Sequence, residues 1–567
     1  MNRVLQNQKR KGCCIIFLHQ RAESAGRVAL FVRRHYYAST SSALQNNNGA
    51  HELQWGNRGQ QPGKQTIDKI SSSNNRSNET PLKQKRHQEH APYTKPKSQQ
   101  FQAPFSVFIS CLPGLEPLLL KEVEYLHSHW LSNDCEVSKR SEGKPHILRG
   151  GVKLTVPSLH HLYILHLYIG TASHIYIRLN DDHFEGLPPL FRARGFPELQ
   201  RKVKDLIISQ RWDELLTTSG HCGNENSLVN VQVHVTTSKS KLMHTKAIEE
   251  RLKQTIGEII PNMSDAATAK TVRLMTRIDR DVVQLSLDTS LTPLHRRGYR
   301  LKPHRAPLRE DLAYALLMAG GLLPCWDLRQ QFSKNSDDSF AADLPSPSSR
   351  GTNHRILFDP FCGSGTIAIE GASLQLGLPP GRFHPAPLDG TCFFNPVLWE
   401  EMKSKAMSAG SSARQYEPVC VAAGDIDPKA LDAAKANAKR AGVDNCIDFV
   451  KGSFVSHPLL NQQSKDGKKS NVMDDAAQQS LLVVANPPYG KRLSQSETNN
   501  TIYRKLANVL LSSSSSSRRS IDCAVIGKDV RVMREAGIPS LDVAFSTKHG
   551  GLSVAAMAGS LPTPNRP

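Results

Sequence analysis

The sequence lacks the patterns that mark several common functional classes. Its eleven cysteines include no C-x-x-C pair, so in a chain of 567 residues we expect neither a zinc framework nor a disulfide scaffold, and no metal. No stretch of about 18 uninterrupted apolar residues occurs, so we expect no membrane-spanning helix. What remains is a long, basic chain with room for roughly two or three domains.

Acidic residues are scarce at the start of the chain. The first 100 residues hold 17 Lys and Arg against five Asp and Glu, so +12 of the net charge of +21 lies there and +9 remains for the other 467 residues. Residues 1–44 contain a single acid, Glu23, among many Arg and Ser, a composition typical of an organelle transit peptide. We expect import into a mitochondrion or plastid, with a cytoplasmic protein as the alternative if the segment is only a disordered tail.

The following segments differ in apolar content. Residues 45–103 are mainly Asn, Gln, Ser, Lys and Pro, and they offer too little apolar surface to offset the entropy of ordering, so we predict a disordered linker. From Phe105 on, short strands and helices alternate, which favours a small α+β unit over residues 104–292.

Residues 293–567 contain apolar strand candidates, each followed by a helical pattern, which is typical of a Rossmann-like, doubly wound parallel sheet. The candidates are residues 356–358, 419–423, 447–450, 481–485 and 523–526. Four polar low-complexity inserts are predicted to be surface loops, at residues 333–353, 404–415, 461–479 and 512–517. The predicted fold class is therefore α/β, with an α+β unit ahead of the Rossmann-like sheet.

The first motif that carries chemistry is ILFDPFCGSGT, residues 356–366. A strand ends in Asp359, a turn with Gly363 and Gly365 follows, and a helix is predicted to begin near Thr366. Such a turn lets a ligand approach the backbone and the free N–H groups of the helix. No Lys follows the glycines and no third Gly completes a dinucleotide pattern. The acid in front suits a ligand with a cationic amino-acid group better than a pyrophosphate.

The second motif, GDIDP, occupies residues 424–428. Asp425 stands at the predicted end of a strand, where a carboxylate can accept hydrogen bonds from both hydroxyl groups of a ribose. Asp427 and Pro428 are a good pair for the N-cap and the first position of a helix, so we interpret Asp427 as a capping residue.

The third motif, NPPY at residues 486–489, follows an apolar strand candidate. The prolines restrict the backbone, and the side-chain oxygen of Asn486 and the next carbonyl can accept two hydrogen bonds from one exocyclic amine. These bonds would orient the nitrogen lone pair, and Tyr489 offers a face on which a flipped base can stack. The alternative is an ordinary turn, which the two preceding motifs disfavour.

In this order, DPFCGSGT, GDIDP and NPPYGKRL resemble class I S-adenosylmethionine-dependent methyltransferases that act on exocyclic amines. The segment DTSLTPLHRRGYRLKPHRAPLREDLAYALL is similar to the junction in bacterial THUMP-domain methyltransferases, most closely the 23S rRNA guanine-N2 methyltransferase family. Upstream, SCLPGLEPLLLKEV and SKSKLMHTKAIEERLKQTIG resemble the ferredoxin-like and THUMP regions of that family. The resemblance covers the chain from Phe105 to its end and implies an RNA-binding N-terminal region.

The resemblance also implies S-adenosylmethionine as the cofactor and assigns roles to the motif residues. The implied cofactor contacts of the first motif are Asp359, Pro360, Cys362, Gly363, Ser364, Gly365 and Thr366. Asp425 is implied to hold the ribose. The target amine is implied to bind at Asn486, Pro487, Pro488 and Tyr489.

Three features depart from the family pattern. The expected DTSG ends in Leu291 here, which we interpret as a loop change. Ser453 follows Gly452 where the family often has an acid beside adenine, which leaves the contact with adenine N6 open. Some members carry a second methyltransferase domain, for which we expect no room after Pro567.

The junction segment is strongly basic. Seven basic residues lie within fourteen positions: Arg296, Arg297, Arg300, Lys302, His304, Arg305 and Arg309. They would form either a patch that neutralises RNA phosphates in a salt-sensitive manner, or a solvated linker with Arg297 or Arg300 in an interdomain salt bridge. The sequence favours neither interpretation.

Together these features predict an S-adenosylmethionine-dependent RNA methyltransferase that forms N2-methylguanosine, in ribosomal rather than transfer RNA, with no membrane or metal partner. The alternatives are methylation of adenine N6 or another exocyclic amine, and a catalytically silent RNA-binding subunit. The THUMP-like half favours RNA, and the intact Asp359, Asp425 and Asn486 favour an enzyme. The modified nucleotide, its RNA and the oligomeric state do not follow from these patterns.

Overall fold

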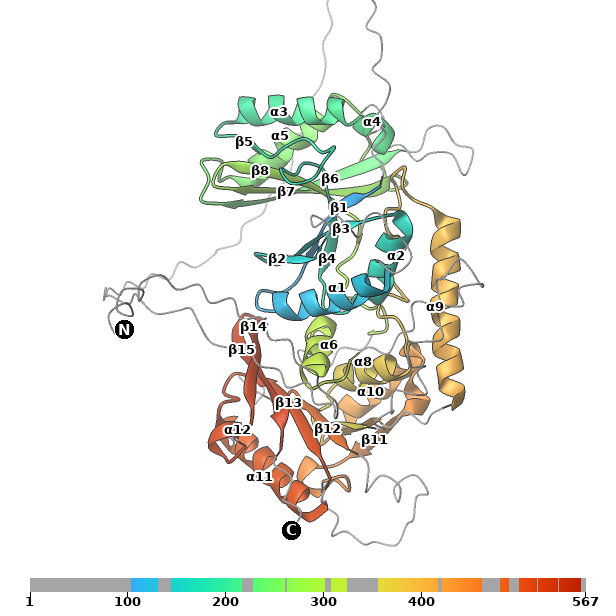
Figure 1. The fold of residues 1–567 in the computed structure, drawn as a ribbon, viewed down its shortest axis with the longest axis vertical. Helices are drawn as coiled ribbons and strands as arrows, with labels where there is room; N and C mark the ends of the chain where they lie inside the picture. Colours follow the sequence, from blue (N-terminus) through green and yellow to red (C-terminus); the bar gives the residue numbers. More distant parts are fainter. Residues whose placement is uncertain are drawn as a thin grey trace, which may run out of the picture. The chain divides into compact units, whose positions relative to one another are not determined.

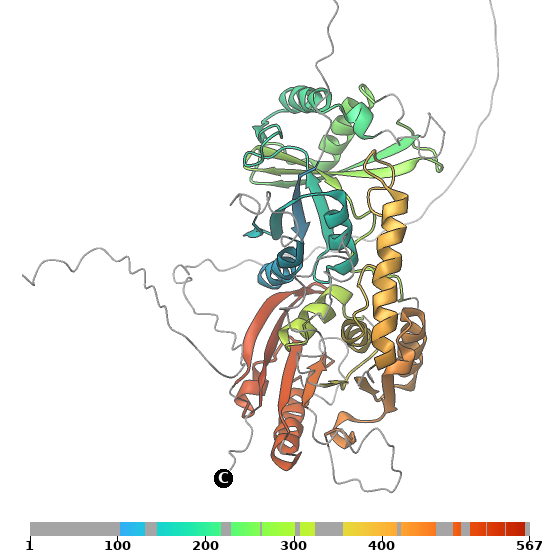
Figure 2. The same cartoon turned by 45° about the vertical axis from the view of Figure 1, so that its right-hand side comes forward.

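The computed structural model describes residues 103–130, 144–216, 228–260, 263–300, 307–323, 355–416, 421–460, 480–488, 499–517, 519–538 and 540–561. These residues belong to one compact unit, residues 93–567 (Figures 1 and 2). The predicted transit peptide, residues 1–44, lies outside the described residues, and so does the predicted linker except for residue 103.

The N-terminal half forms an eight-stranded sheet in the order β2-β3-β1-β4-β8-β7-β6, with β5 paired to β8. Paired strands run antiparallel except β6 and β7, which run parallel. The strands are β1 (Phe105–Ser110), β2 (His146–Leu148), β3 (Gly151–Val156), β4 (His174–Arg178), β5 (Phe191–Arg192), β6 (Val229–Ser238), β7 (Lys270–Asp279) and β8 (Val282–Asp288). The helices are α1 (Glu116–Trp130), α2 (Leu159–Tyr168), α3 (Phe196–Ser209), α4 (Trp212–Leu215) and α5 (Thr245–Gly257).

One face of this sheet is apolar because apolar residues alternate with polar ones along its strands. In β6, Val231, Val233 and Val235 are buried, whereas Gln232 and His234 between them are exposed. Helix α5 packs on β6, and α3 packs on α5 (Figure 1). The period of two in the strand therefore sets which face the helices cover.

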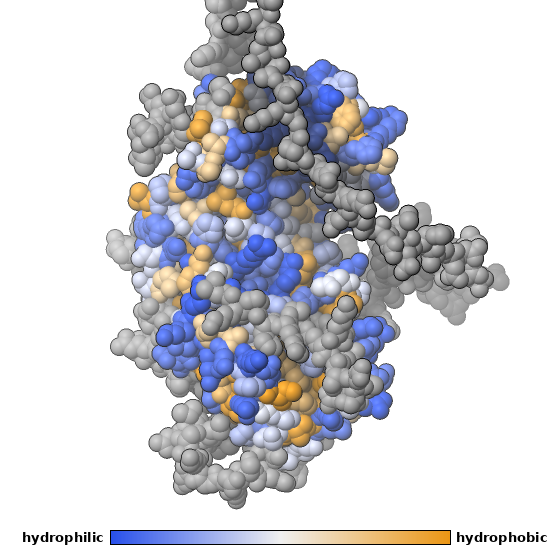
Figure 3. All heavy atoms as spheres, turned by 180° about the vertical axis from the view of Figure 1, so that it is seen from behind, coloured by the Kyte–Doolittle hydropathy of each residue, from blue (hydrophilic) through white to orange (hydrophobic). Residues whose placement is uncertain are grey.

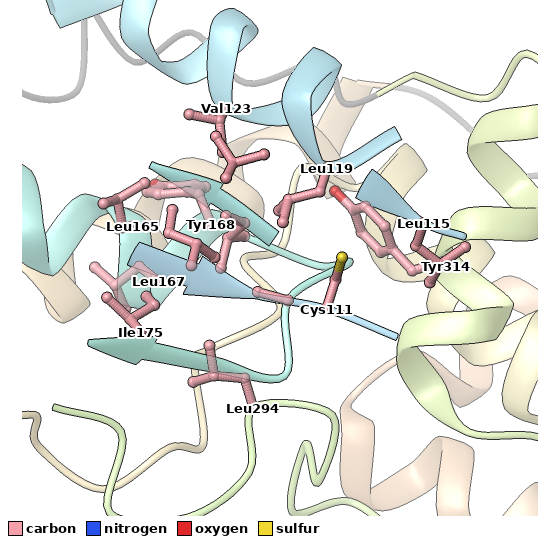
Figure 4. Close-up of a cluster of buried hydrophobic side chains, with 14 of the residues drawn as sticks. Cys111, Leu115, Leu119, Val123, Leu165, Leu167, Tyr168, Ile175, Leu294 and Tyr314 are labelled. Atoms are coloured by element: carbon pink, nitrogen blue, oxygen red, sulfur yellow. The ribbon is translucent and has the colours of Figure 1, made fainter. Parts of the chain in front are cut away.

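The core of the N-terminal half continues towards the next helix, α6 (Glu310–Ala319). Leu115, directly before α1, and Leu119 and Val123 within it are spaced four residues apart, and each is 0% exposed. Figure 4 shows these side chains in one cluster with Tyr314 of α6. A Cβ at Gly170 would lie 2.4 Å from the Tyr314 ring, so this close approach requires glycine.

The C-terminal half forms a seven-stranded sheet in the order β11-β10-β9-β12-β13-β15-β14. The first five of these strands are parallel, and β15 is antiparallel to β13 and β14. The strands are β9 (Ile356–Asp359), β10 (Val421–Asp425), β11 (Ile447–Lys451), β12 (Leu481–Ala485), β13 (Ile521–Gly527), β14 (Asp542–His549) and β15 (Leu552–Ser560). The helices after α6 are α8 (Thr366–Gln375), α9 (Pro396–Tyr416), α10 (Pro428–Ala441), α11 (Asn499–Ser517) and α12 (Val532–Glu535), with short 3₁₀ turns η4 (Asp444–Cys446) and η5 (Phe454–Ser456).

The central strands of this sheet are buried throughout. All five residues of β12 and all four of β9 are buried, because helices cover both faces of a parallel sheet. This arrangement confirms the predicted fold class, a mixed α/β protein with a Rossmann-like sheet. No strand was predicted at β2, β3, β5 or β7, nor was the hairpin of β14 and β15.

Two of the four inserts predicted as surface loops are helical. Residues 404–415 lie within α9, and residues 512–517 form the end of α11. The other two, residues 333–353 and 461–479, lie outside the described residues.

Burial explains the helical serines of α11. Ser513 and Ser514 are 5% and 1% exposed, because they extend the buried stripe that begins with Leu506 and Leu510. Serine is an indifferent helix former rather than a helix breaker, so packing decides the conformation of this run.

Candidate active site

Three parallel strands end at one edge of the C-terminal sheet, and each leads into one of the three motifs. Strand β9 ends at Asp359, β10 at Asp425, and β12 directly before Asn486. Strand β9 lies between β10 and β12, so the chain order reverses here, which is where α/β sheets bind ligands. A cavity of about 360 Å³ lies at this edge.

Most of the predicted site residues line this cavity: Pro360, Cys362, Gly363, Ser364, Thr366, Asp425, Asn486 and Pro488. Asp359, Gly365 and Pro487 do not line it. Tyr489 lies outside the described residues.

The glycine turn of the first motif needs both of its glycines. Gly363 has a φ of +53° and Gly365 a φ of +85°, which L side chains rarely adopt. A Cβ at Gly365 would lie 3.0 Å from the Cβ of Ala434 on α10, whereas a Cβ at Gly363 would meet no atom within 4 Å. Gly365 therefore permits helix packing, and Gly363 leaves open space where α8 begins.

Asp425 is held in place by backbone N–H groups. Its Oδ2 accepts a hydrogen bond from Gly363 N at 2.9 Å, and its Oδ1 accepts one from Asp427 N at 2.9 Å. Each carboxylate oxygen can accept a second bond, so the group remains able to bind hydroxyl groups. Asp427 in turn accepts a hydrogen bond from Lys429 N at 2.9 Å, as expected for an N-cap.

Asp359 is fully buried and incompletely hydrogen-bonded. Its Oδ1 accepts a bond from Phe361 N at 3.3 Å, and the backbone N–H of Ala368 in α8 also stabilises the carboxylate, whereas its Oδ2 has no partner of full hydrogen-bond geometry among the described residues. Burial raises the pKa of this carboxyl to about 8, and the nearby charge of Asp425 acts in the same direction. The Oγ of Ser364, a cavity-lining residue, is also buried without a partner in the described part of the chain.

The third motif presents one further unpaired acceptor. Asn486 Oδ1 is shielded from solvent, and no described residue hydrogen-bonds to it. Buried polar oxygens are paired in the great majority of cases, so such an atom at a cavity marks a place for an outside donor. Pro487 is buried and Pro488 half-buried.

The cavity also has an apolar wall that the motif analysis missed. The rings of Phe361 and Phe454 lie 5.0 Å apart, and both line the cavity. Ile426 lines it as well and is 73% exposed, an unusual exposure for an isoleucine. Their positions in the sequence could have indicated them. Phe361 lies inside the first motif, Ile426 lies inside the second, and Phe454 directly follows Ser453.

Ser453 lines the cavity at the position where the family often has an acid. Its Oγ accepts a hydrogen bond from Val455 N at 3.4 Å, so the side chain caps the turn η5. The junction also contributes to the cavity wall, because Pro307 and Leu308 line the cavity.

Three junction cations are paired within the fold: Arg297 with Glu370 at 3.7 Å, Arg300 with Glu310 at 3.1 Å, and Arg309 with Asp311 at 2.6 Å. Arg296 is exposed. The remaining members of the cluster lie outside the described residues: Lys302, His304 and Arg305. Of the two interpretations of this cluster, the salt bridge within the protein therefore applies to Arg297 and Arg300.

The described residues contain neither a metal cluster nor a membrane-spanning helix. No group of three or more His, Cys, Asp or Glu in them could hold a metal ion. None of their helices is both long and apolar enough to cross a membrane. On the face seen in Figure 3, hydrophilic residues predominate and hydrophobic ones form small groups among them.

The chain is similar to known proteins at both the sequence and the fold level. Residues 347–536 match the family model described as RMKL-like, methyltransferase domain. The chain is 27% identical over 414 residues to the ribosomal RNA large subunit methyltransferase K/L of Syntrophotalea carbinolica, an alignment that covers 72% of this chain and 47% of that relative. The chain thus spans about half the length of this curated relative.

Two solved structures share the fold. The crystal structure of a predicted N6-adenine-specific DNA methylase from Listeria monocytogenes has a TM-score of 0.55 at 22% identity and covers 82% of this chain and 97% of its own. The structure of SMU.472, described as a methyltransferase and complexed with SAH, has a TM-score of 0.57 at 17% identity and covers 82% and 100%. The resemblance indicated by the motifs is therefore confirmed: the chain is similar to the large-subunit rRNA methyltransferases K/L, and its residues 347–536 match the RMKL-like methyltransferase domain.

Proposed function

We propose that the protein is an S-adenosylmethionine-dependent RNA methyltransferase that forms N2-methylguanosine in ribosomal RNA. The match of residues 347–536 to a methyltransferase domain supports the reaction class, and the name of the relative from Syntrophotalea carbinolica supports large-subunit ribosomal RNA as the substrate. The observation that carries the proposal is the unpaired Oδ1 of Asn486 beside a cavity at the switch point of the sheet.

The cavity offers suitable partners for each part of S-adenosylmethionine. The Oγ of Ser364, which lines the cavity, and the carboxylate of Asp359, which precedes the lining residue Pro360, can accept hydrogen bonds from the amino group of the amino-acid moiety. The carboxylate of Asp425 can accept the ribose hydroxyls, and the apolar wall with Ile426 and Phe454 suits the faces of adenine. Among solved structures of this fold, SMU.472 is complexed with SAH, the demethylated form of this cofactor.

The chain's own contribution to the chemistry is orientation of the acceptor. When bound, the cofactor would supply a methyl group carried by a sulfonium. The amine of guanine is a weak nucleophile because its lone pair is conjugated with the ring. Asn486 Oδ1 and the carbonyl of Pro487 can accept both of its N–H groups, which holds the lone pair in one direction and favours transfer through proximity.

A cysteine nucleophile does not fit the site. Cys362 lines the cavity, but burial raises the pKa of its thiol well above the usual value, so the reactive thiolate is disfavoured. No cysteine stands at positions 486–488, where the acceptor amine would bind. The geometry therefore favours methylation of an exocyclic amine over covalent methylation of a pyrimidine carbon.

We further propose that residues 104–292 are a ferredoxin-like and THUMP region that binds RNA, and that residues 293–567 form the methyltransferase domain. Residues 1–44 would direct the protein to a mitochondrion or plastid, and residues 45–103 would connect this leader to the body. The composition of the first 100 residues supports both assignments.

A second candidate function is methylation of adenine N6, in transfer RNA or elsewhere. The Listeria monocytogenes protein of the same fold is described as a predicted N6-adenine-specific DNA methylase, and an Asn-Pro-Pro clamp can hold either amine. A silent RNA-binding subunit is the third candidate, and the unpaired acceptors at the cavity argue against it.

The test is a cofactor titration followed by product analysis, both with the full chain. Calorimetry with S-adenosylmethionine and S-adenosylhomocysteine should show binding, and absence of binding would reject the enzyme. After incubation with unmodified large-subunit ribosomal RNA and labelled cofactor, nucleoside mass spectrometry should show N2-methylguanosine. Detection of labelled N6-methyladenosine instead would support the second candidate function, methylation of adenine N6.

A further inference from the structure

We propose that Arg300 is a positioning residue for the cofactor: it holds Leu308 of the junction against Thr366 in the first turn of α8 and so closes the cavity on the junction side. The proposal rests on the proposed function, because it takes S-adenosylmethionine as the occupant of that cavity.

The contacts of Arg300 converge on one atom. Its Nη2 donates to the carbonyl of Leu308 at 2.8 Å and to Thr366 Oγ1 at 2.9 Å, and it lies 3.1 Å from Glu310 Oε1. The side chain of Arg300 is only 14% exposed, so water competes little for these bonds. Hydrogen bonds from an ionised donor in such surroundings are stronger than those between neutral groups.

Two of these three acceptors belong to the cavity wall. Leu308 and Thr366 both line the cavity, although Arg300 and Thr366 are 66 residues apart in the chain. An arginine that served only to neutralise Glu310 would need neither bond. Arg300 therefore joins two separate pieces of the wall around one cation.

The N-cap position of α8 supplies no side chain to hold the first turn of the helix. Its N-cap is Gly365, which has no side chain and makes no capping hydrogen bond. Thr366, the first residue of the helix, is bonded to Arg300 through its side-chain oxygen. The position of the first turn, where the cofactor is proposed to bind, is thus set in part by the junction.

The junction is in turn anchored to the N-terminal half. Arg297 Nη2 donates to the carbonyl of Gly170 at 2.5 Å, and Tyr299 donates its hydroxyl to Glu370 Oε1 at 2.9 Å. Glu370 lies one turn after Thr366 on α8, so a four-residue segment holds this helix at two successive turns. The wall of the cavity is therefore connected through residues 297–300 to the half proposed to bind RNA.

The first variant that tests the proposal is Arg300→Met, studied in the full chain by calorimetry with S-adenosylhomocysteine. We expect the dissociation constant to rise by about tenfold or more, the equivalent of one charge-assisted hydrogen bond. In steady-state assays the KM for S-adenosylmethionine should rise, whereas the KM for RNA should stay within about threefold. Arg300→Lys keeps a cation with three donors and should restore affinity to within about threefold of the original protein.

Loss of Arg300 also leaves the carboxylate of Glu310 buried without its cation, which can destabilise the fold. The double variant Arg300→Met/Glu310→Gln removes both charges and should recover the unfolding temperature. If Arg300 positions the cavity wall, this double variant still binds the cofactor about tenfold more weakly. If affinity returns together with stability, Arg300 has a purely structural role and the proposal is wrong.

The matched control is Arg296→Met, which removes an exposed cation of the same segment and should leave cofactor affinity unchanged. If the original protein does not bind S-adenosylhomocysteine at all, the proposed function fails. If it binds and Arg300→Met binds equally well, only the assignment of Arg300 fails. Equal losses for Arg296→Met and Arg300→Met would also overturn it, since charge alone would then explain the effect.

Discussion

The junction and the edge of the C-terminal sheet are both rich in buried polar groups, but the two regions differ in whether an opposite charge lies beside these groups. At the junction, Arg297 and Arg300 each face an acid, Glu370 and Glu310. At the sheet edge, Asp359 Oδ2, Ser364 Oγ and Asn486 Oδ1 are buried without a partner among the described residues and face no opposite charge. The Nε atoms of Arg297 and Arg300 also lack a hydrogen bond in the described part of the chain, but each guanidinium keeps an acid beside it.

The difference separates groups that build the fold from groups that await a ligand. An unpaired buried polar atom costs about 1–3 kcal/mol, which a protein tolerates chiefly where an outside molecule supplies the partner. A buried charge is tolerated as long as its counter-ion remains, and removal of one partner costs about 3–5 kcal/mol. We therefore expect substitutions of polar residues to reduce stability at the junction and to reduce binding or turnover at the sheet edge.

The largest effect is expected from Asn486→Ala at the sheet edge. It should reduce methyl transfer by about a thousandfold or more, since the acceptor that orients the amine is lost. Single-turnover assays would measure this, and calorimetry should show cofactor affinity within a few fold and an unchanged unfolding temperature. Asn486→Asp keeps an oxygen at the same place and should retain more activity; equal turnover for Asn486→Ala and the original protein would reject the amine clamp.

At the junction, Glu370→Gln should act mainly on stability. The substitution keeps an acceptor for Tyr299 but deprives Arg297, whose side chain is 1% exposed, of the acid that stabilises its charge most. We expect the free energy of unfolding in urea to fall by about 3 kcal/mol. The control is Glu401→Gln, which removes an exposed i,i+4 pair with Lys405 and should cause no measurable change. Equal stability of both variants would contradict the contrast between the two regions.

Asp359→Asn should raise the free energy of unfolding at pH 8, whereas Glu370→Gln should lower it. An aspartate titrates near about 3.9 in an unfolded chain, whereas the folded pKa of Asp359 is about 8. The raised pKa means that its contribution to stability is fully present below pH of about 4 and is lost as the pH rises through about 8. At pH 8 the variant, which carries no charge, should unfold with a free energy higher by on the order of 2 kcal/mol.

The same variant should bind the cofactor more weakly, because the ionised Asp359 is lost as a partner for a cationic amino group. In the original protein, cofactor affinity should rise between pH 6 and pH 8 as Asp359 ionises, and calorimetry across this range should show no such rise for Asp359→Asn. Asp432→Asn on the exposed face of α10 serves as the control. A variant that is both less stable and unchanged in affinity would refute this role.

The smallest effect is expected at Ser453, which lines the cavity without an acid. Ser453→Asp keeps an N-cap acceptor for Val455 and adds a carboxylate where adenine N6 is proposed to lie. We expect the dissociation constant of S-adenosylhomocysteine to fall by about threefold to tenfold, as for one added hydrogen bond. Ser453→Ala removes the cap without adding an acceptor and should leave affinity within about twofold; a similar gain for both variants would contradict the adenine contact.

Much of the site could be predicted because its signals are local. Asp359, Asp425 and Asn486 each follow an apolar run, and parallel strands bring the ends of such runs to one edge. Strand β7 was not predicted. Its buried residues alternate with polar ones, among them the basic Arg273 and Arg277, so the segment contains no continuous apolar run. The serines of α9 and α11 were assigned to loops because their composition is polar, whereas their conformation depends on what they pack against.

The partners of the junction cations show the limit of sequence reasoning most clearly. The spacing of Arg297, Arg300 and Arg309 is the same whether they face RNA or acids of the fold, and only packing brings Glu370 and Thr366 beside them. The cavity wall from Phe454, Ile426 and Leu308 likewise joins segments that no motif connects.

The sequence by itself therefore determined the three motifs and their order along the chain, including the glycine turn. It also determined the candidate groups for contacts with the amino group, the ribose and the acceptor amine. Each of these features depends on residues within a few positions of one another. The tertiary structure alone decided which polar atoms are paired and which remain unpaired. Pairing depends on distances of about 3 Å between residues far apart in the chain, and only the packed fold sets those distances.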